Sequence, residues 1–186
     1  MTTQPTQNLS ELKASAEAVF GQDAVLADRS ERDFYSSDLY QSGETADLVI
    51  APASSEDVAT LVKFAAKHSL SVFARGGGRS YSNAFLPDRP NAILLDTRRL
   101  NRIRKIDPEN LIATVECGCT WKVLDEALSA HGLRSVFWGP ASGAEATIGG
   151  SMSQGTANNQ AGLIETSSNA VTSYEIVTGI DRKSVV

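Results

Sequence analysis

Phe73-Ala74-Arg75-Gly76-Gly77-Gly78-Arg79-Ser80-Tyr81 sets three successive glycines between two arginines, directly after a short stretch with strand character. Glycine adopts backbone conformations that other residues avoid, and successive main-chain N–H groups can then converge on one anion. The arginines add positive charge, and the serine adds a hydroxyl donor. The segment therefore predicts a binding loop for a pyrophosphate group, with a plain flexible turn as the alternative.

The two familiar nucleotide loops do not match this segment. A Rossmann fingerprint has the spacing G-x-G-x-x-G and opens a helix. Here no glycine stands three residues after Gly78, and residues 83–89 contain Pro87 and no helical stripe. The Gly-Lys-Ser/Thr sequence of a P-loop is also absent. A NAD-dependent Rossmann protein is therefore the weaker alternative.

A second glycine-rich segment runs from Gly139 to Gly162, where six of 24 residues are glycine. Its centre is Ala146-Thr147-Ile148-Gly149-Gly150-Ser151-Met152-Ser153. Small side chains let a backbone approach a flat ligand closely, while hydroxyl and N–H groups can bind its polar edge. A connection of this length without regular structure is usually functional. We expect a binding loop for a flat heterocycle, with a disordered polar linker as the alternative.

The first loop lies within a strand–helix–strand pattern. Residues 48–51 and 71–74 have strand character, and Ser54 with Asp57 forms a capping pair that opens a helix to about His68. Two strands joined by one helix are usually parallel and adjacent. The pattern thus predicts a small β-α-β unit that ends in the glycine loop.

The rest of the chain alternates short elements. In the N-terminal part we expect a helix over 11–20 capped by Ser10 and irregular pieces over 23–43. A strand over 92–96 and a hairpin of 103–106 with 111–117 should follow the first loop. We then expect a helix after the cap Thr120 that closes at Gly132, and strands over 171–178 and from 183.

Composition narrows the class of protein. The chain has 186 residues, 41% of them hydrophobic and 21% charged, with 14 glycines and a net charge of −5. These values exclude collagen-like and wholly disordered chains. The acidic balance, without a Lys/Arg block, disfavours nucleic-acid binding. No apolar run approaches the ~18 residues of a membrane span, and residues 1–10 lack a signal pattern, so we expect a cytoplasmic protein.

Taken in order, these motifs resemble the FAD-binding (PCMH-type) domain of the vanillyl-alcohol oxidase / p-cresol methylhydroxylase flavoprotein superfamily. The resemblance runs from about Thr45 to Val186. It rests on Ile50-Ala51-Pro52 before Ser55-Glu56-Asp57-Val58, Arg75 to Tyr81, Val115-Glu116-Cys117-Gly118 with Trp121, Gly139-Pro140 through Gly150, and Asn169-Ala170-Val171 with Glu175 to Gly179.

The resemblance implies an α+β fold with two subdomains. A small parallel β-α-β part would pack beside a larger, mainly antiparallel sheet with flanking helices. Residues 1–9 would form a disordered tail, residues 10–44 an N-terminal helix and lead-in, and residues 45–186 the FAD-binding domain. That domain would be incomplete at its C-terminal side, without the substrate or cap domain of the family.

The resemblance also implies the cofactor site. The first loop would hold the FAD pyrophosphate, the second would follow the phosphates, ribityl chain and flavin edge, and one backbone would contact the adenine. These residues are Gly76, Gly77, Gly78, Arg79, Ser80, Ser142, Thr147, Gly149, Gly150, Ser153 and Val177. Arg75 would support the loop rather than touch FAD. Relatives with covalent FAD use a histidine where this chain has Arg79, and no cysteine lies between 139 and 162; FAD would therefore be non-covalent.

By the same resemblance, the chain would belong to a flavin-dependent oxidoreductase. Such an enzyme oxidises a CH–OH group of a hydroxy acid, sugar or alcohol by hydride transfer to FAD. The implied partners are a small-molecule substrate, an electron acceptor, and a cap-domain partner or the remainder of a longer chain, with neither nucleic acid nor a transmembrane segment. No residue can be assigned as the catalytic base. The alternative is an FAD- or nucleotide-binding module without catalysis of its own.

Overall fold

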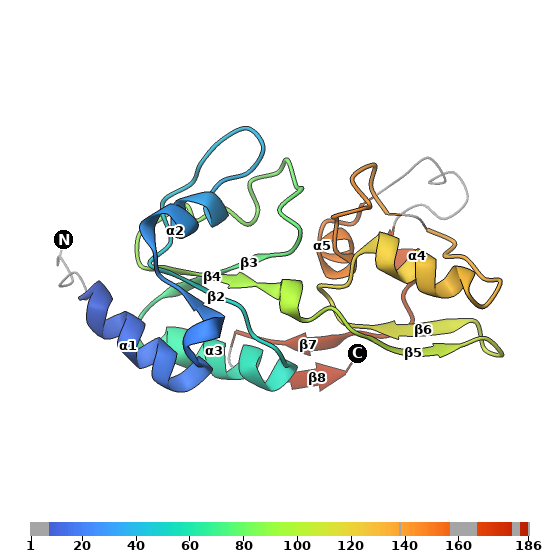
Figure 1. Ribbon diagram of the computed structural model, residues 1–186, viewed down its shortest axis with the longest axis horizontal. Helices are drawn as coiled ribbons and strands as arrows, with labels where there is room; N and C mark the ends of the chain where they lie inside the picture. The colour runs from blue at the N-terminus through green and yellow to red at the C-terminus, as the bar shows by residue number, and fades with distance from the viewer. Residues whose placement is uncertain (1–7, 138, 157–166, 180–182, 186) are drawn as a thin grey trace.

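The computed structural model describes residues 8–137, 139–156, 167–179 and 183–185. Two parts lie side by side (Figure 1). One contains a four-stranded sheet with α1 (Leu9–Phe20), α2 (Arg29–Tyr35) and α3 (Ser55–Lys67). The other contains the hairpin of β5 (Ile103–Asp107) and β6 (Ile112–Val115), with α4 (Trp121–Ser129) and α5 (Ile148–Ser153). The expected α+β class is confirmed.

The four-stranded sheet has the order β1-β2-β4-β3. β2 (Leu48–Ile50) and β3 (Ser71–Arg75) each pair in parallel with β4 (Ala92–Asp96), and β1 (Val25–Leu26) pairs antiparallel with β2. The expectation that β2 and β3 would be adjacent is therefore wrong, because β4 lies between them. Every residue of β4 is buried, as the central strand of a sheet covered on both faces requires.

Apolar side chains cover both faces of this sheet. Leu48, Ile50 and Ile93 pack with Leu61 and Phe64 of α3 on the face that α1 and α3 cover. Val49 and Leu94 belong to a separate cluster against which Tyr35 of α2 packs. Because neighbouring positions along β2 and β4 alternate between two apolar layers, the ends of the strands are held firmly.

Local capping signals predicted the helices well. The Ser54 hydroxyl accepts from the Asp57 N–H at the start of α3, as expected. In α1, Asn8 rather than Ser10 is the cap, so the helix begins at Leu9, inside the expected tail of residues 1–9. Within residues 23–43, expected to be irregular, the structure has β1 and α2. Both elements are too short for a periodic pattern to indicate them.

The second part has its own core of Trp121, Leu124, Leu128, Phe137 and Ile148. The hairpin and the helix after Thr120 are confirmed. β7 (Glu175–Val177) pairs antiparallel with β8 (Lys183–Val185). Within the described residues, β5 with β6 and β7 with β8 form two-stranded antiparallel sheets, each smaller than the four-stranded sheet.

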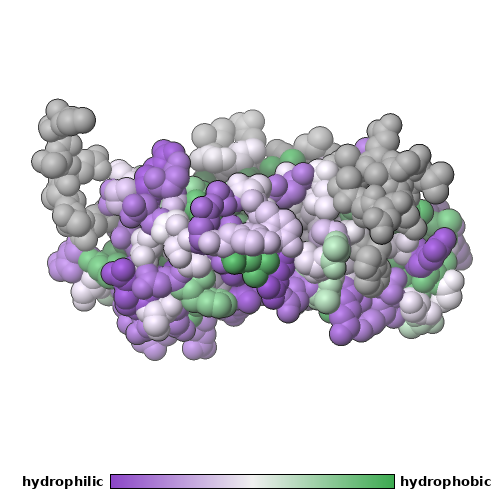
Figure 2. Space-filling view, turned by 90° about the horizontal axis from the view of Figure 1, so that it is seen from above, coloured by the Kyte–Doolittle hydropathy of each residue, from purple (hydrophilic) through white to green (hydrophobic). Residues whose placement is uncertain are grey.

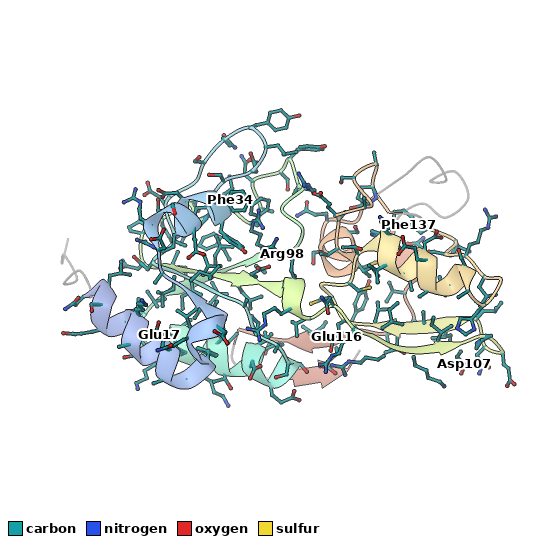
Figure 3. The ribbon with its side chains drawn as sticks, in the orientation of Figure 1. Glu17, Phe34, Arg98, Asp107, Glu116 and Phe137 are labelled. Carbon is teal, nitrogen blue, oxygen red and sulfur yellow. The ribbon has the colours of Figure 1, made fainter. Side chains whose placement is uncertain are left out.

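A buried carboxylate lies just after β6, near the junction of the two parts (Figure 3). Glu116 is 6% exposed and accepts from the main-chain N–H and the Nε of Arg102, both at 2.9 Å. Arg104 Nη2 lies 3.2 Å from Glu116 Oε1. Hydrogen bonding from Arg102 lowers the pKa of Glu116 despite its burial. The folded state therefore binds this proton less readily than the unfolded state, and the stabilisation is lost as pH falls through the folded-state pKa.

The structure describes no helix that is both long enough and apolar enough to cross a bilayer.

Glu116→Gln should lower the free energy of unfolding by about 2 kcal/mol at neutral pH, because it removes a charge-assisted hydrogen-bond network. The difference from the wild type should shrink as pH falls below the ordinary pKa of a glutamate and through the lowered pKa of folded Glu116, where the wild-type carboxylate takes up its proton. Urea unfolding across this pH range measures both effects. Glu109→Gln, at an exposed position of the β5–β6 turn, should change stability by less than about 0.5 kcal/mol at every pH. If the difference in free energy of unfolding between Glu116→Gln and the wild type stayed the same at every pH, the stabilising role of the Glu116 charge would be contradicted.

Candidate functional site

The two glycine-rich segments lie directly against each other. A Cβ atom on Gly77 would overlap the carbonyl oxygen of Glu145, and one on Gly76 would overlap the hydroxyl of Thr147. Real Cβ atoms do not approach other atoms so closely, so both positions need glycine. The sequence predicted each loop separately, and the structure shows that they form one site.

Main-chain hydrogen bonds fix the second loop to the end of β6 and the start of α4. The Ile148 N–H donates to the Cys119 carbonyl and the Gly149 N–H to the Cys117 carbonyl, each at 2.8 Å. Thr147 also forms an isolated bridge with Thr120. The loop is therefore as rigid as the hairpin and helix beneath it.

Part of the second segment is helical, which corrects the expectation of a connection without regular structure. The Thr147 hydroxyl accepts from the Gly150 N–H at 3.3 Å and caps α5. Trp121 Nε1 donates to the Ser151 hydroxyl at 2.8 Å. The Ser153 hydroxyl donates to the Gly149 carbonyl at 2.8 Å. The sequence carried the capping signal at Thr147, but two glycines in the first turn weaken any helical pattern.

The first loop leaves its N–H groups unused. Among the described residues, no main-chain carbonyl accepts a hydrogen bond from the N–H groups of Gly76, Gly77 or Gly78, although all three glycines are partly buried. Buried N–H groups are nearly always paired in folded proteins. Gly78 has φ +66°, the left-handed conformation that turns the chain here. The loop thus presents donors for an anion.

Side chains add to the donors around the loops. Arg79 forms an ion pair with the exposed Glu145 across the two loops. The Ser80 hydroxyl lies 2.7 Å from that of Ser82, which donates to Gln154 Oε1 at 3.0 Å, beyond the end of α5. These contacts join the loops a second time.

A hollow of about 320 Å³ opens between the loops and the lead-in segment. Arg79, Ser142, Glu145 and Leu39 line it. A neighbouring hollow of about 300 Å³ has Arg98, Thr120 and Thr147 on its wall. Figure 3 places Arg98 between the two parts. Where residues are coloured in Figure 2, the face that carries the loops is largely hydrophilic or intermediate with small hydrophobic patches, which suits a polar ligand.

Most of the predicted site residues are brought together. The glycine loops, their arginine and serines, Ser142, and the first turn of α5 with Ser153 form one neighbourhood. Val177 is apart from it, in β7, which lies near α3 and away from α5 in Figure 1. Sequence reasoning missed Leu39, Gln154 and Glu145. Leu39 comes from the lead-in segment, and only the folded chain brings it to the loops.

Curated relatives share similar sequences. Over 155 residues the chain is 35% identical to D-lactate dehydrogenase of Archaeoglobus fulgidus, a match that covers 77% of this chain and 34% of that protein. It is 34% identical over 102 residues to the mitochondrial cytochrome D-lactate dehydrogenase of Kluyveromyces lactis, covering 54% of this chain and 18% of that protein. The chain thus spans about a third or less of the length of these relatives.

Solved structures share the fold. An alkyldihydroxyacetonephosphate synthase superposes with a TM-score of 0.83 at 22% identity, covering 95% of this chain and 38% of that one. p-Cresol methylhydroxylase superposes with a TM-score of 0.79 at 21% identity, covering 100% of this chain and 36% of that one. At such low identity these matches establish the architecture alone.

Gly77→Ala should destabilise the chain by about 2 kcal/mol, because the added methyl group must push the two loops apart. Thermal unfolding should show this as a melting temperature lower by about 4–8 °C. Gly179→Ala is the matched control, since its Cβ would meet nothing within 4 Å and its backbone is not left-handed. Equal melting temperatures for the two variants would show that the loops do not pack as described.

The family comparison agrees with the site. Unused N–H groups, an arginine and clustered hydroxyls on two glycine loops suit a ligand with a pyrophosphate group. The model of the FAD binding domain family matches residues 46–181, most of the chain. The fold neighbours agree with the PCMH-type architecture that the motifs resemble. The chain therefore belongs to the family of FAD-binding domains, and FAD is its cofactor.

Proposed function

We propose that this chain is the FAD-binding portion of a flavin-dependent oxidoreductase that oxidises a CH–OH group of a hydroxy acid, sugar or alcohol by hydride transfer to FAD. When bound, FAD supplies a two-electron acceptor, which amino-acid side chains lack. The protein supplies the position and the electrostatic surroundings of the cofactor.

One observation carries the assignment of the loops to the cofactor: within the described residues, the N–H groups of three successive, partly buried glycines have no main-chain partner, and Arg79 lies beside them. A pyrophosphate accepts several hydrogen bonds and carries the opposite charge, so it would satisfy both features. In this proposal the holding residues are Gly76, Gly77, Gly78, Arg79, Ser80, Ser142, Gly149, Gly150 and Ser153. Thr147 acts from beneath, since its buried hydroxyl caps α5. A backbone contact of Val177 with adenine stays a prediction.

Arg79 can leave Glu145 and bind another anion with little loss of free energy. Its side chain is 35% exposed, and that of its partner Glu145 is 58% exposed. Ion pairs between exposed side chains contribute about 0–1 kcal/mol. A phosphate group carries more charge and more acceptor atoms than the Glu145 carboxylate. We therefore expect Arg79 to turn from Glu145 to the pyrophosphate when the cofactor binds.

The substrate class rests on the relatives. The sequence match to D-lactate dehydrogenase supports oxidation of a CH–OH group. A small-molecule substrate, an electron acceptor, and a cap-domain partner or further chain complete the proposal. The two hollows beside the loops have no histidine on their walls within the described residues. Glu145 is on both walls, but its carboxylate pairs with Arg79, so no base is assigned to the reaction.

A second candidate is an FAD-binding module without catalysis of its own, because no described residue is assigned as the base that accepts the substrate proton. In that case the chain would take up FAD, and no substrate would reduce it. The cytoplasmic location stays a prediction under either candidate.

FAD should be released by acid, because Arg79 occupies the place where covalent relatives carry a histidine. Precipitating the yellow protein with acid should leave the flavin absorbance in the supernatant. A guanidine-denatured sample passed through a filter gives the same comparison without acid. Yellow colour retained on the precipitate or above the filter would contradict non-covalent binding.

Anaerobic reduction tests the reaction. The purified chain, loaded with FAD, should show flavin absorbance near ~450 nm, and D-lactate or another small hydroxy acid should bleach it. Dithionite is the positive control, because it reduces any bound flavin. Bleaching by dithionite alone, across a panel of hydroxy acids, sugars and alcohols, would favour the module. A colourless chain that takes up no FAD would contradict both candidates.

A further inference from the structure

We propose that Arg75 is a positioning residue for the cofactor: a buried positive charge without a carboxylate partner, which holds the pyrophosphate in the first loop through space. The inference rests on the proposed placement of the pyrophosphate in that loop. It adds a role for Arg75 beyond mechanical support of the loop.

Arg75 is buried and short of partners. It is 5% exposed, and its Nε and Nη1 atoms have no hydrogen-bond partner among the residues that the structure describes. Burial, and next the charge of Arg98, lower the pKa of Arg75. An arginine nevertheless stays protonated in proteins, because its reference pKa lies far above neutral pH. The chain therefore keeps a desolvated cation at the end of β3.

Aromatic rings, rather than carboxylates, surround this cation. The guanidinium carbon lies 5.0 Å from the ring centre of Tyr35, 5.3 Å from that of Phe85 and 5.8 Å from that of Phe34. Figure 3 shows Phe34 on α2, above Arg98. The faces of aromatic rings attract cations, but more weakly than a carboxylate does. The rings also exclude water, so they leave the charge weakly screened.

The neighbouring acid is already engaged. Asp96 accepts from Arg98 Nε at 3.0 Å and from Arg98 Nη2 at 3.0 Å, and Arg98 also bonds the hydroxyl of Tyr35. Arg79 pairs with the exposed Glu145. Within the described chain, three arginines thus share two acids, one of them at the surface, and the surplus positive charge resides on Arg75.

The surplus charge lies directly against the first loop. A Cβ on Gly78 would overlap the guanidinium of Arg75, so the loop passes over that group with no side chain between them. An anion bound to the N–H groups of the loop would lie within a few ångströms of a weakly screened cation. Arg75 lines neither hollow among the residues described, so it acts without contacting the ligand.

A second buried arginine shows how the chain treats such a group elsewhere. Arg32 is 8% exposed, and it donates from Nε to the Ala27 carbonyl at 3.0 Å and from Nη1 to the Ala46 carbonyl at 2.8 Å. Its donors are satisfied by the protein, as buried polar groups normally are. Arg75 breaks this rule at the one place where an anionic ligand is expected.

The difference between the two arginines supplies the experiment. In apoprotein, Arg75→Met should leave the melting temperature unchanged or raise it, because it removes an unpaired buried charge. Its affinity for FAD should be roughly ten- to a hundred-fold weaker. Inorganic pyrophosphate, which should raise the melting temperature of wild-type apoprotein, should no longer do so. Arg75→Lys keeps the charge and should bind FAD within about three-fold of the wild type.

Arg32→Met is the matched control. It should lower the apoprotein melting temperature by roughly 5 °C or more, because the buried Ala46 carbonyl and the part-buried Ala27 carbonyl lose their donor, and should leave FAD affinity unchanged. Arg75→Met that fails to fold, melts as low as Arg32→Met, or binds FAD like the wild type would overturn the inference. Wild-type chain that binds neither FAD nor pyrophosphate would instead overturn the placement of the pyrophosphate, and the inference with it.

Discussion

The close approach of two backbones, at Gly77 and Glu145, is the constraint on which the site depends. The segment with Gly77 follows β3, and the segment with Glu145 lies between α4 and α5. No Cβ atom fits between the two segments. Through this contact, the four-stranded sheet and the hairpin with its helices are held in one relative position. A ligand that touches both loops therefore meets a surface that is already assembled, which reduces the entropy lost on binding.

Charge is arranged around this contact in a consistent way. Asp96 and Glu116 are buried carboxylates, and each is neutralised by arginines from neighbouring elements. Both lie near the junction of the two parts. The buried acids therefore pair with arginines from nearby parts of the chain. The unpaired N–H groups belong to the first glycine loop, and the unpaired guanidinium of Arg75 lies directly against that loop. In the proposed site, a bound anion would accept hydrogen bonds from these N–H groups and balance the positive charge of Arg75.

Local features of the fold could be predicted from the sequence, whereas contacts between distant residues could not. Ser54 and Thr120 cap helices as their spacing indicates, because capping depends on residues three or four positions apart. The order of strands was predicted wrongly, since nothing in residues 48–75 says that a strand from 92–96 will insert between them. The same limit applies to the site. Each glycine loop was visible alone, but the overlap of Gly76 with Thr147 exists only in the folded chain.

The central position of β4 has a consequence for the order of assembly. β2 and β3 have no hydrogen bonds to each other and are joined only through β4, which is synthesised after both. The glycine loop at the end of β3 thus cannot be anchored until the later strand has docked, and it meets its partner loop later still. Contacts between such distant residues form slowly because of the chain entropy they consume. In the proposed site, cofactor uptake would then follow synthesis of both glycine loops, because the two loops touch only after the later segment has been made.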